Sequence, residues 1–248
     1  MILRRVIEHV KAQNWTAVAL DFVIVVVGVF IGIQVSNWND ARAERSREAT
    51  YLTGVAEDLR SDMIEIDAVI AVSASRMAAL DLLLEKTGKW SRPADFASSR
   101  GVAEIQTIEP FDETGRNTIG GELFILNTLD GNRFAYETLI NTGGIGIIRD
   151  KVLVRDIQNY YASVDKARRF ELSLEESRAR LIDAQQAVGI SFIDGATAEE
   201  LAPVFRDNAP LAAAAKNYWI YANRHLILMH DLKGEAQTLA SRIESEVL

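Results

Sequence analysis

The 248-residue sequence contains no cysteine, little proline and no excess of positive charge. Without cysteine the chain has neither a disulfide framework nor a thiolate metal site, and it suits a reducing or an oxidising compartment equally. All four prolines lie after the first third of the chain, at Pro93, Pro110, Pro203 and Pro210. The long stretch before Pro93 therefore favours helix, because proline breaks a helix interior.

The charge balance argues against a nucleic-acid partner. The net charge is −8, whereas binding to phosphates requires a basic surface. Residues 1–14 carry three basic residues and one acidic residue, a balance of +2, which leaves −10 for the rest of the chain. A basic segment beside an apolar run suits the anionic inner leaflet of a membrane.

The longest apolar run lies near the N-terminus. Residues 15–34 contain one strongly polar side chain before the final glutamine, that of Asp21, and Phe22 to Ile33 are all apolar or glycine. Twenty helical residues span about 30 Å, the thickness of a hydrocarbon core. We therefore predict a transmembrane helix over residues 15–36. A buried core helix would rarely be apolar on every side for four turns.

The residues that border this span are typical of a membrane interface. Trp15 precedes it, and Asn37, Trp38 and Asn39 follow it. Tryptophan at both ends matches the aromatic belts of spanning helices. A cleaved signal peptide would need small residues at the end of the apolar run, where this chain is polar and aromatic. We expect an uncleaved anchor, preceded by an amphipathic basic segment over residues 1–14.

Small residues recur on one face of the predicted span. Gly28, Gly32 and Ser36 are spaced four apart, so two helices could approach closely along this face. Asp21 lies two turns before Gly28 and falls on nearly the same face. Its carboxylate could be a proton or ion site, or it could have a structural role, either as a polar contact that fixes the helix register or through simple proximity to the interface. We interpret these four residues as a helix-association face.

The rest of the chain, residues 37–248, reads as a mainly α-helical soluble domain. A stalk helix is expected over 37–86, continuous with the span, because its apolar residues recur at steps of three and four. The stripe consists of Leu52, Val55, Leu59, Met63, Ile66, Val69 or Ile70, Met77, Leu80 and Leu84. An irregular insertion is expected over 87–131, and within it Glu104 to Ile108 could be strand or helix.

Three further helices complete the expected up-and-down bundle. A short one should cover 132–142, with Asn132 as its N-cap and a glycine pair ending it. The second should cover 150–188, capped by Asp150. The third should cover 209–246, opened by Asn208 and Pro210. A short helix should precede it within 189–207. The expected core residues of the two long helices are Leu153, Ile157, Tyr160, Tyr161, Val164, Leu181, Ala215, Tyr218 or Trp219, Ala222, Leu226, Met229, Leu232, Leu239 and Ile243.

Two stretches resemble a family of bacterial single-pass membrane proteins known only as a domain of unknown function. Residues 25–63 contain a Gly-rich apolar helix that runs into the Asn-Trp-Asn motif, and residues 134–165 contain a Tyr-Glu-x-Leu helix, a glycine break and paired tyrosines. The second set of motif residues is Tyr136, Glu137, Leu139, Gly143, Tyr160 and Tyr161. Where this chain has Asp21, the family carries a glutamate. The resemblance implies an anchor and a helical domain, and no activity.

No catalytic or cofactor pattern emerges. His225 and His230 are five residues apart, whereas zinc-binding pairs on a helix are four apart, so we expect no metal and read His225 as a packing residue. The glycines of residues 142–151 lack the spacing of a phosphate-binding loop and read as helix stop, turn and N-cap. The polar loop cluster Asp112, Glu113 and Arg116 reads as solvated or as a partner contact. The aromatic residues Tyr218, Trp219 and Tyr221 read as core or as the lining of a ligand pocket.

The sequence therefore predicts a non-enzymatic membrane protein without a cofactor. Lysine and arginine are equally numerous near both ends of the span, so the positive-inside rule decides little. Because a long C-terminal domain after a signal anchor is commonly translocated, we expect the bacterial inner membrane, with a cytoplasmic N-terminus and a periplasmic domain. The expected partners are the lipid bilayer and further copies or other membrane subunits, as in a scaffold or accessory subunit. The alternative is a membrane-anchored sensory or ligand-binding domain.

Overall fold

Helix dominates the structure, a computed structural model that describes residues 15–98, 101–114, 118–191 and 195–247. This confirms the predicted, mainly α-helical class. The predicted basic segment 1–14 lies outside the described residues. The elements in chain order are α2 (Trp15–Lys86), β1 (Asp95–Ser98), β2 (Gly101–Glu104), α3 (Ile119–Phe124), α4 (Phe134–Asn141), a 3-10 turn η1 (Gly144–Gly146), α5 (Lys151–Ala187), α6 (Ala198–Asp207) and α7 (Ala209–Val247).

The chain divides into two compact units, Met1–Thr50 and Tyr51–Leu248. The described part of the first unit is the beginning of α2, which has no proline and only two glycines before Thr50. The second unit holds every other element. The boundary between the two units thus falls within the predicted stalk, between Thr50 and Tyr51.

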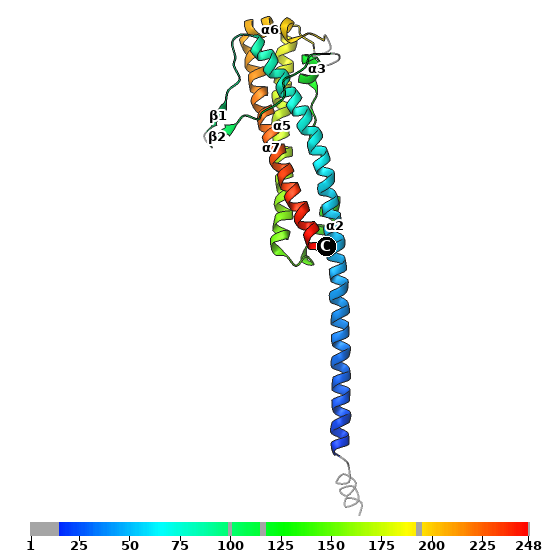
Figure 1. The fold of residues 1–248 in the computed structure, drawn as a ribbon. Coiled ribbons are helices and arrows are strands. Elements are labelled where there is room, and N and C mark those ends of the chain that lie inside the picture. Colours follow the sequence, from blue (N-terminus) through cyan, green and yellow to red (C-terminus); the bar gives the residue numbers. More distant parts are fainter. Residues whose placement is uncertain (1–14, 99–100, 115–117, 192–194, 248) are drawn as a thin grey trace, which may run out of the picture. The chain divides into compact units, whose positions relative to one another are not determined.

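In the second unit, the later part of α2 packs with α5 and α7 around two hydrophobic clusters. The α2 stripe is buried as predicted, with Met63 and Ile70 partly exposed, and so are the predicted core residues of α5 and α7. Figure 1 shows α5 and α7 side by side over their length. Summed over these stripes, apolar burial is the main stabilising contribution, at about 25 cal/mol per Å² removed from water.

Cross-helix contacts fix the direction of each helix. Asp67 of α2 pairs with Lys233, and Asp81 further along α2 accepts a hydrogen bond from Trp219, so α7 runs opposite to α2. The first cluster joins the earlier parts of α2 and α5 and the second joins their later parts, so these two helices run in the same direction. The return between them is made by the segment from residue 87 to residue 150.

Capping residues explain where several helices begin. The Asp150 carboxylate accepts from the backbone N–H groups of Val152 and Leu153, as predicted for the cap of α5. Asn208 accepts from Leu211 N at the start of α7, also as predicted. Helix α4 begins one residue later than a cap at Asn132 would place it, since its N-cap position is Arg133.

The glycine pair after α4 ends that helix as predicted. Gly143 has φ +71°, a left-handed conformation that glycine adopts without strain, and its N–H donates to Ile140 O. Gly144 then begins the 3-10 turn beside Tyr51. Residues 142–151 are thus a helix stop, a turn and an N-cap.

The insertion 87–131 contains more regular structure than the sequence indicated. Strands β1 and β2 pair as an antiparallel hairpin, with Asp95 opposite Glu104. The strand therefore ends at Glu104 and does not extend over the predicted 104–108. Helix α3 is also unpredicted, because Gly120 and Gly121 lie inside it. The Thr118 side chain caps α3 through Gly121 N, and burial of Ile119 and Leu123 offsets the low helix propensity of glycine.

Candidate functional site

The described part of the first unit presents an exposed apolar helix. Its large apolar side chains between residues 20 and 35 are all exposed, by 48 to 69%: Leu20, Phe22, Val23, Ile24, Val25, Val26, Val27, Val29, Phe30, Ile31, Ile33 and Val35. By length and composition this is the one helix among the described residues that can cross a membrane, although a signal sequence near an N-terminus passes the same test. At roughly 1.5–3 kcal/mol for burial of each side chain, the twelve together favour an apolar environment by about 20–35 kcal/mol.

The predicted association face lies on this exposed helix. Asp21, Gly28, Gly32 and Ser36 are all exposed. A Cβ atom added at Gly28 or at Gly32 would meet nothing within 4 Å, so neither glycine is required by packing within the chain. The structure brings the four residues onto one helix, and their role in association stays a prediction.

The predicted interface residues are helical as well. Trp15 begins α2, but its side chain lies outside the described part. Asn37, Trp38 and Asn39 form exposed turns within α2, and the Trp38 side chain is 62% exposed. The guanidinium carbon of Arg42 lies 5.8 Å from the centre of the Trp38 ring, a cation–π contact. The helix thus continues without a break beyond the apolar run, and charged residues follow at once.

The second unit contains a row of carboxylates that sequence reasoning missed. Asp58, Asp62 and Glu65 lie on one face of α2 and accept from the backbone N–H groups of residues 130–132 and of Ala135, which lies in the first turn of α4. Asp62 accepts from Asn132 N at 2.5 Å, and Asp58 from Ala135 N at 2.8 Å. These bonds satisfy a stretch of backbone that no strand or helix satisfies.

Both buried carboxylates of this row carry an electrostatic cost. Burial raises the pKa of Asp58 and of Asp62 above the ordinary value, although the hydrogen bonds they accept oppose the increase. The Tyr160 hydroxyl donates to Asp62 at 2.7 Å. Burial also raises the pKa of Tyr160, with the Asp62 charge adding to the effect, so the phenol stays protonated and remains a donor.

The Tyr-Glu-x-Leu motif and the paired tyrosines meet in one cluster. The Tyr136 ring stacks on Tyr161 with centroids 4.0 Å apart, and Tyr160 meets Tyr161 edge-on at 5.2 Å. Arg133 lies over both Tyr136 and Tyr161 and forms an ion pair with Asp165. The motif therefore fastens α4 to α5, which is a structural role.

A second buried group resembles a catalytic triad in composition. His225 Nδ1 lies 2.9 Å from Ser73 Oγ, and His225 Nε2 lies 2.9 Å from Glu171 Oε1. All three side chains are at least 95% buried, and none lines either of the two cavities described below. A nucleophile needs access to its substrate. The group is therefore a polar layer of the core, and His225 is a satisfied packing residue as predicted.

The other candidate residues that the structure describes do not form a common site. His230 is exposed, so it does not share a site with His225. Glu113 accepts from Ala198 N and so caps α6, which also has a capping box between Thr197 and Glu200. Asp112 accepts from Thr114, and Arg116 lies outside the described residues.

The aromatic run of α7 is core and not a pocket lining. Tyr218 and Trp219 are buried, and Trp219 meets Trp90 edge-on at 5.5 Å. Tyr221 is half-buried and stacks on Phe170. Trp219 Nε1 donates to Asp81 at 2.7 Å. Burial raises the pKa of Asp81 to about 6, although the charge of Arg92, 3.3 Å away, opposes the increase.

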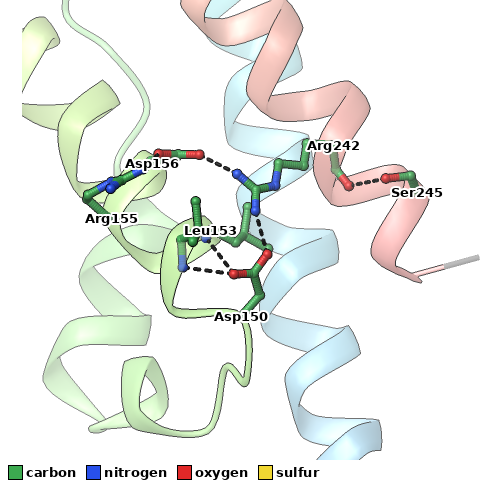
Figure 2. A network of polar contacts seen from close by, with 7 residues as sticks. Asp150, Leu153, Arg155, Asp156, Arg242 and Ser245 are labelled. Atoms are coloured by element: carbon green, nitrogen blue, oxygen red, sulfur yellow. Dashed lines mark hydrogen bonds and ion pairs between the residues drawn. The ribbon is translucent and has the colours of Figure 1, made fainter.

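Two hollows are described on the second unit. One, of about 170 Å³, is lined by Asp81, Glu85, Arg92, Glu109 and apolar neighbours. The other, of about 540 Å³, is an open groove between α5 and α7. At its edge, Arg242 bridges Asp150 and Asp156, as Figure 2 shows, and so ties the end of α7 to the start of α5. Neither hollow combines the convergent groups that a reaction requires.

The comparisons with known proteins give a match for the first part of the chain only. Residues 21–89 match a family of unknown function (DUF6090), a region that covers α2 from Asp21 to its end. No curated protein and no solved structure gives a significant match. This similarity agrees with the resemblance read from the sequence in pointing to a domain of unknown function.

Proposed function

We propose that the protein is a single-pass membrane protein that acts without catalysis, as a self-associating scaffold or as an accessory subunit of a larger membrane complex. The observation that carries the proposal is the apolar helix whose twelve large side chains are all exposed. Lipid covers such a surface at no cost in backbone hydrogen bonds, because a helix satisfies its own. The anchor lies in the bacterial inner membrane, with a cytoplasmic N-terminus and a periplasmic domain.

Self-association follows from the open face of this helix. A Cβ added at Gly28 or at Gly32 would meet no atom of the described residues within 4 Å, which leaves their lack of side chains free to serve a contact with another helix. The Asp21 carboxylate on the same face is costly in lipid unless a second helix supplies a donor. Association of copies through this face satisfies both requirements.

The test is the mass of the full chain in mild detergent, measured by light scattering with correction for bound detergent. Gly28→Leu and Gly32→Leu should lower the mass to that of a monomer, because leucine separates the helices. Val26→Leu, half a turn away from this face, is the matched control and should keep the oligomer. Wild type that is monomeric and captures no membrane protein from native membranes would remove the basis for the proposal.

The orientation can be tested separately, because the chain has no cysteine. Ala179→Cys places one thiol at an exposed position of α5. A membrane-impermeant maleimide should label it in intact spheroplasts. Labelling only after lysis would place the domain in the cytoplasm.

A further inference from the structure

An arginine with no charged partner lies inside the second unit. The Arg76 side chain is fully buried, yet no carboxylate among the described residues forms an ion pair with it. Its Nε and Nη2 atoms donate to Ile125 O at 3.3 and 3.1 Å, and its Nη1 has no hydrogen-bond partner. A buried charge is normally paired and hydrogen-bonded, since its desolvation is otherwise uncompensated.

Two further donors without partners lie beside it. The Arg76 guanidinium carbon lies 5.8 Å from the centre of the Tyr218 ring, and the buried Tyr218 hydroxyl has no hydrogen-bond partner. Arg178 donates from Nη1 to Phe124 O at 2.8 Å, while its buried Nε is unpartnered. Three helices thus supply one unpartnered donor each to the same region beneath α3.

The pKa shifts of these groups agree with the contacts described above. Burial lowers the pKa of Arg76, and the positive charge of Arg178 lowers it further, while Tyr218 and the carboxylate of Glu122 oppose this. Burial raises the pKa of Tyr218, and the charges of Arg76 and Arg178 both oppose that increase. The two positive charges thus act on each other, and Glu122 compensates the charge of Arg76 only in part.

The carbonyl groups at the end of α3 provide only part of the compensation. Phe124 O and Ile125 O accept three N–H bonds from the two arginines, and the helix end adds a partial negative charge. Arg178 also approaches Glu175, at 3.7 Å, on the solvent side. None of these acceptors serves Arg76 Nη1, Arg178 Nε or Tyr218 Oη.

We propose that Arg76, Arg178 and Tyr218 bind a small oxyanion, of the phosphate or carboxylate class, between α2, α5 and α7. Guanidinium groups match the paired oxygens of such anions, and a phenol adds a neutral donor. The side chain of Arg178 is 17% exposed, so an anion would reach this residue first, whereas Arg76 and Tyr218 are fully buried.

The experiment measures thermal unfolding of the full chain in detergent with inorganic phosphate or acetate, at constant ionic strength set with chloride. A ligand that binds only the folded state raises the unfolding temperature in proportion to the logarithm of its concentration. Wild type should respond to one of the two anions, and whichever gives the larger rise identifies the class.

Single substitutions test whether the rise in unfolding temperature with anion depends on these residues. Arg178→Gln should weaken anion binding about 10- to 100-fold, the effect of one lost charge-assisted hydrogen bond. Arg180→Gln is the matched control, since it removes an exposed arginine from the same helix, and it should leave the response unchanged. Tyr218→Phe should weaken binding without lowering stability in the absence of anion, because its hydroxyl has no partner to lose.

The proposal is overturned if neither anion acts beyond chloride, or if Arg178→Gln and Arg180→Gln respond alike. Should Arg178→Gln fail to fold, the phosphate or acetate response of Tyr218→Phe decides: an undiminished response overturns the site. Detergent extraction and oligomer mass play no part in this readout, so the outcome is independent of the anchor.

Discussion

The buried Asp62 provides the sharpest test of how the domain is held together. Its carboxylate is fully buried and accepts from Tyr160 Oη and from Asn132 N. Asp62→Ala leaves both donors without an acceptor, at about 1–3 kcal/mol each. Burial raises the pKa of Asp62, so the folded protein disfavours the carboxylate charge. Removal of the carboxylate therefore recovers part of the stability that is lost with the two hydrogen bonds. We therefore expect the free energy of unfolding to fall by about 2–4 kcal/mol.

Asp67→Ala is the matched control on the same helix. Asp67 is 54% exposed and pairs with Lys233 on the surface, so its loss should cost no more than about 1 kcal/mol. The assay is urea denaturation of the full chain in detergent, followed by circular dichroism. A double-mutant cycle of Asp62→Ala with Tyr160→Phe should show coupling of about 0.5–3 kcal/mol. Equal costs for Asp62→Ala and Asp67→Ala would refute the reasoning.

Two further predictions follow from close packing and from a raised pKa. Gly144→Ala should destabilise the protein by about 1–3 kcal/mol, because the added Cβ would lie 2.8 Å from the Tyr51 ring. Gly146→Ala is the control, since a Cβ there meets open space and should not destabilise the protein. Equal unfolding midpoints for the two variants would contradict this. The pKa of Asp81 is raised from 3.8 to about 6, so this residue binds its proton more tightly in the folded state. As the pH falls from 7 toward 4, Asp81 should therefore stabilise the folded protein by at most about 3 kcal/mol. Asp81→Asn should remove this part of the pH dependence, and identical profiles for wild type and variant would exclude it.

Periodicity allowed most of the helical core to be predicted from the sequence. Leucine and valine at steps of three and four along α2 gave its buried face, and Asp150 and Asn208 marked two helix starts. Helix α3 was missed because Gly120 and Gly121 read as breakers, although packing of Ile119 outweighs their propensity. Local preference is a weak guide where a short segment is held by tertiary contacts.

The polar interior was harder to predict than the apolar core. Asp58 and Asp62 were not predicted to be buried, because the N–H groups they bind lie 77 and 70 positions later in the chain. Their spacing of four, beside the apolar stripe, was a signal that they share the buried face. No such signal marked Arg76, whose acceptor belongs to a segment with no periodicity.

The central claim, that the apolar helix of the first unit lies in lipid, is tested most directly by alkaline carbonate extraction of membranes that contain the full chain. The wild-type chain should stay in the pellet. Arginine at two positions, Val25→Arg with Ile31→Arg, should release part of it, since each charge costs about 2.5–3.5 kcal/mol at the centre of a span. Ile64→Arg, at a 74% exposed position of the second unit, should release none. Recovery of the wild-type chain in the soluble fraction would contradict the account.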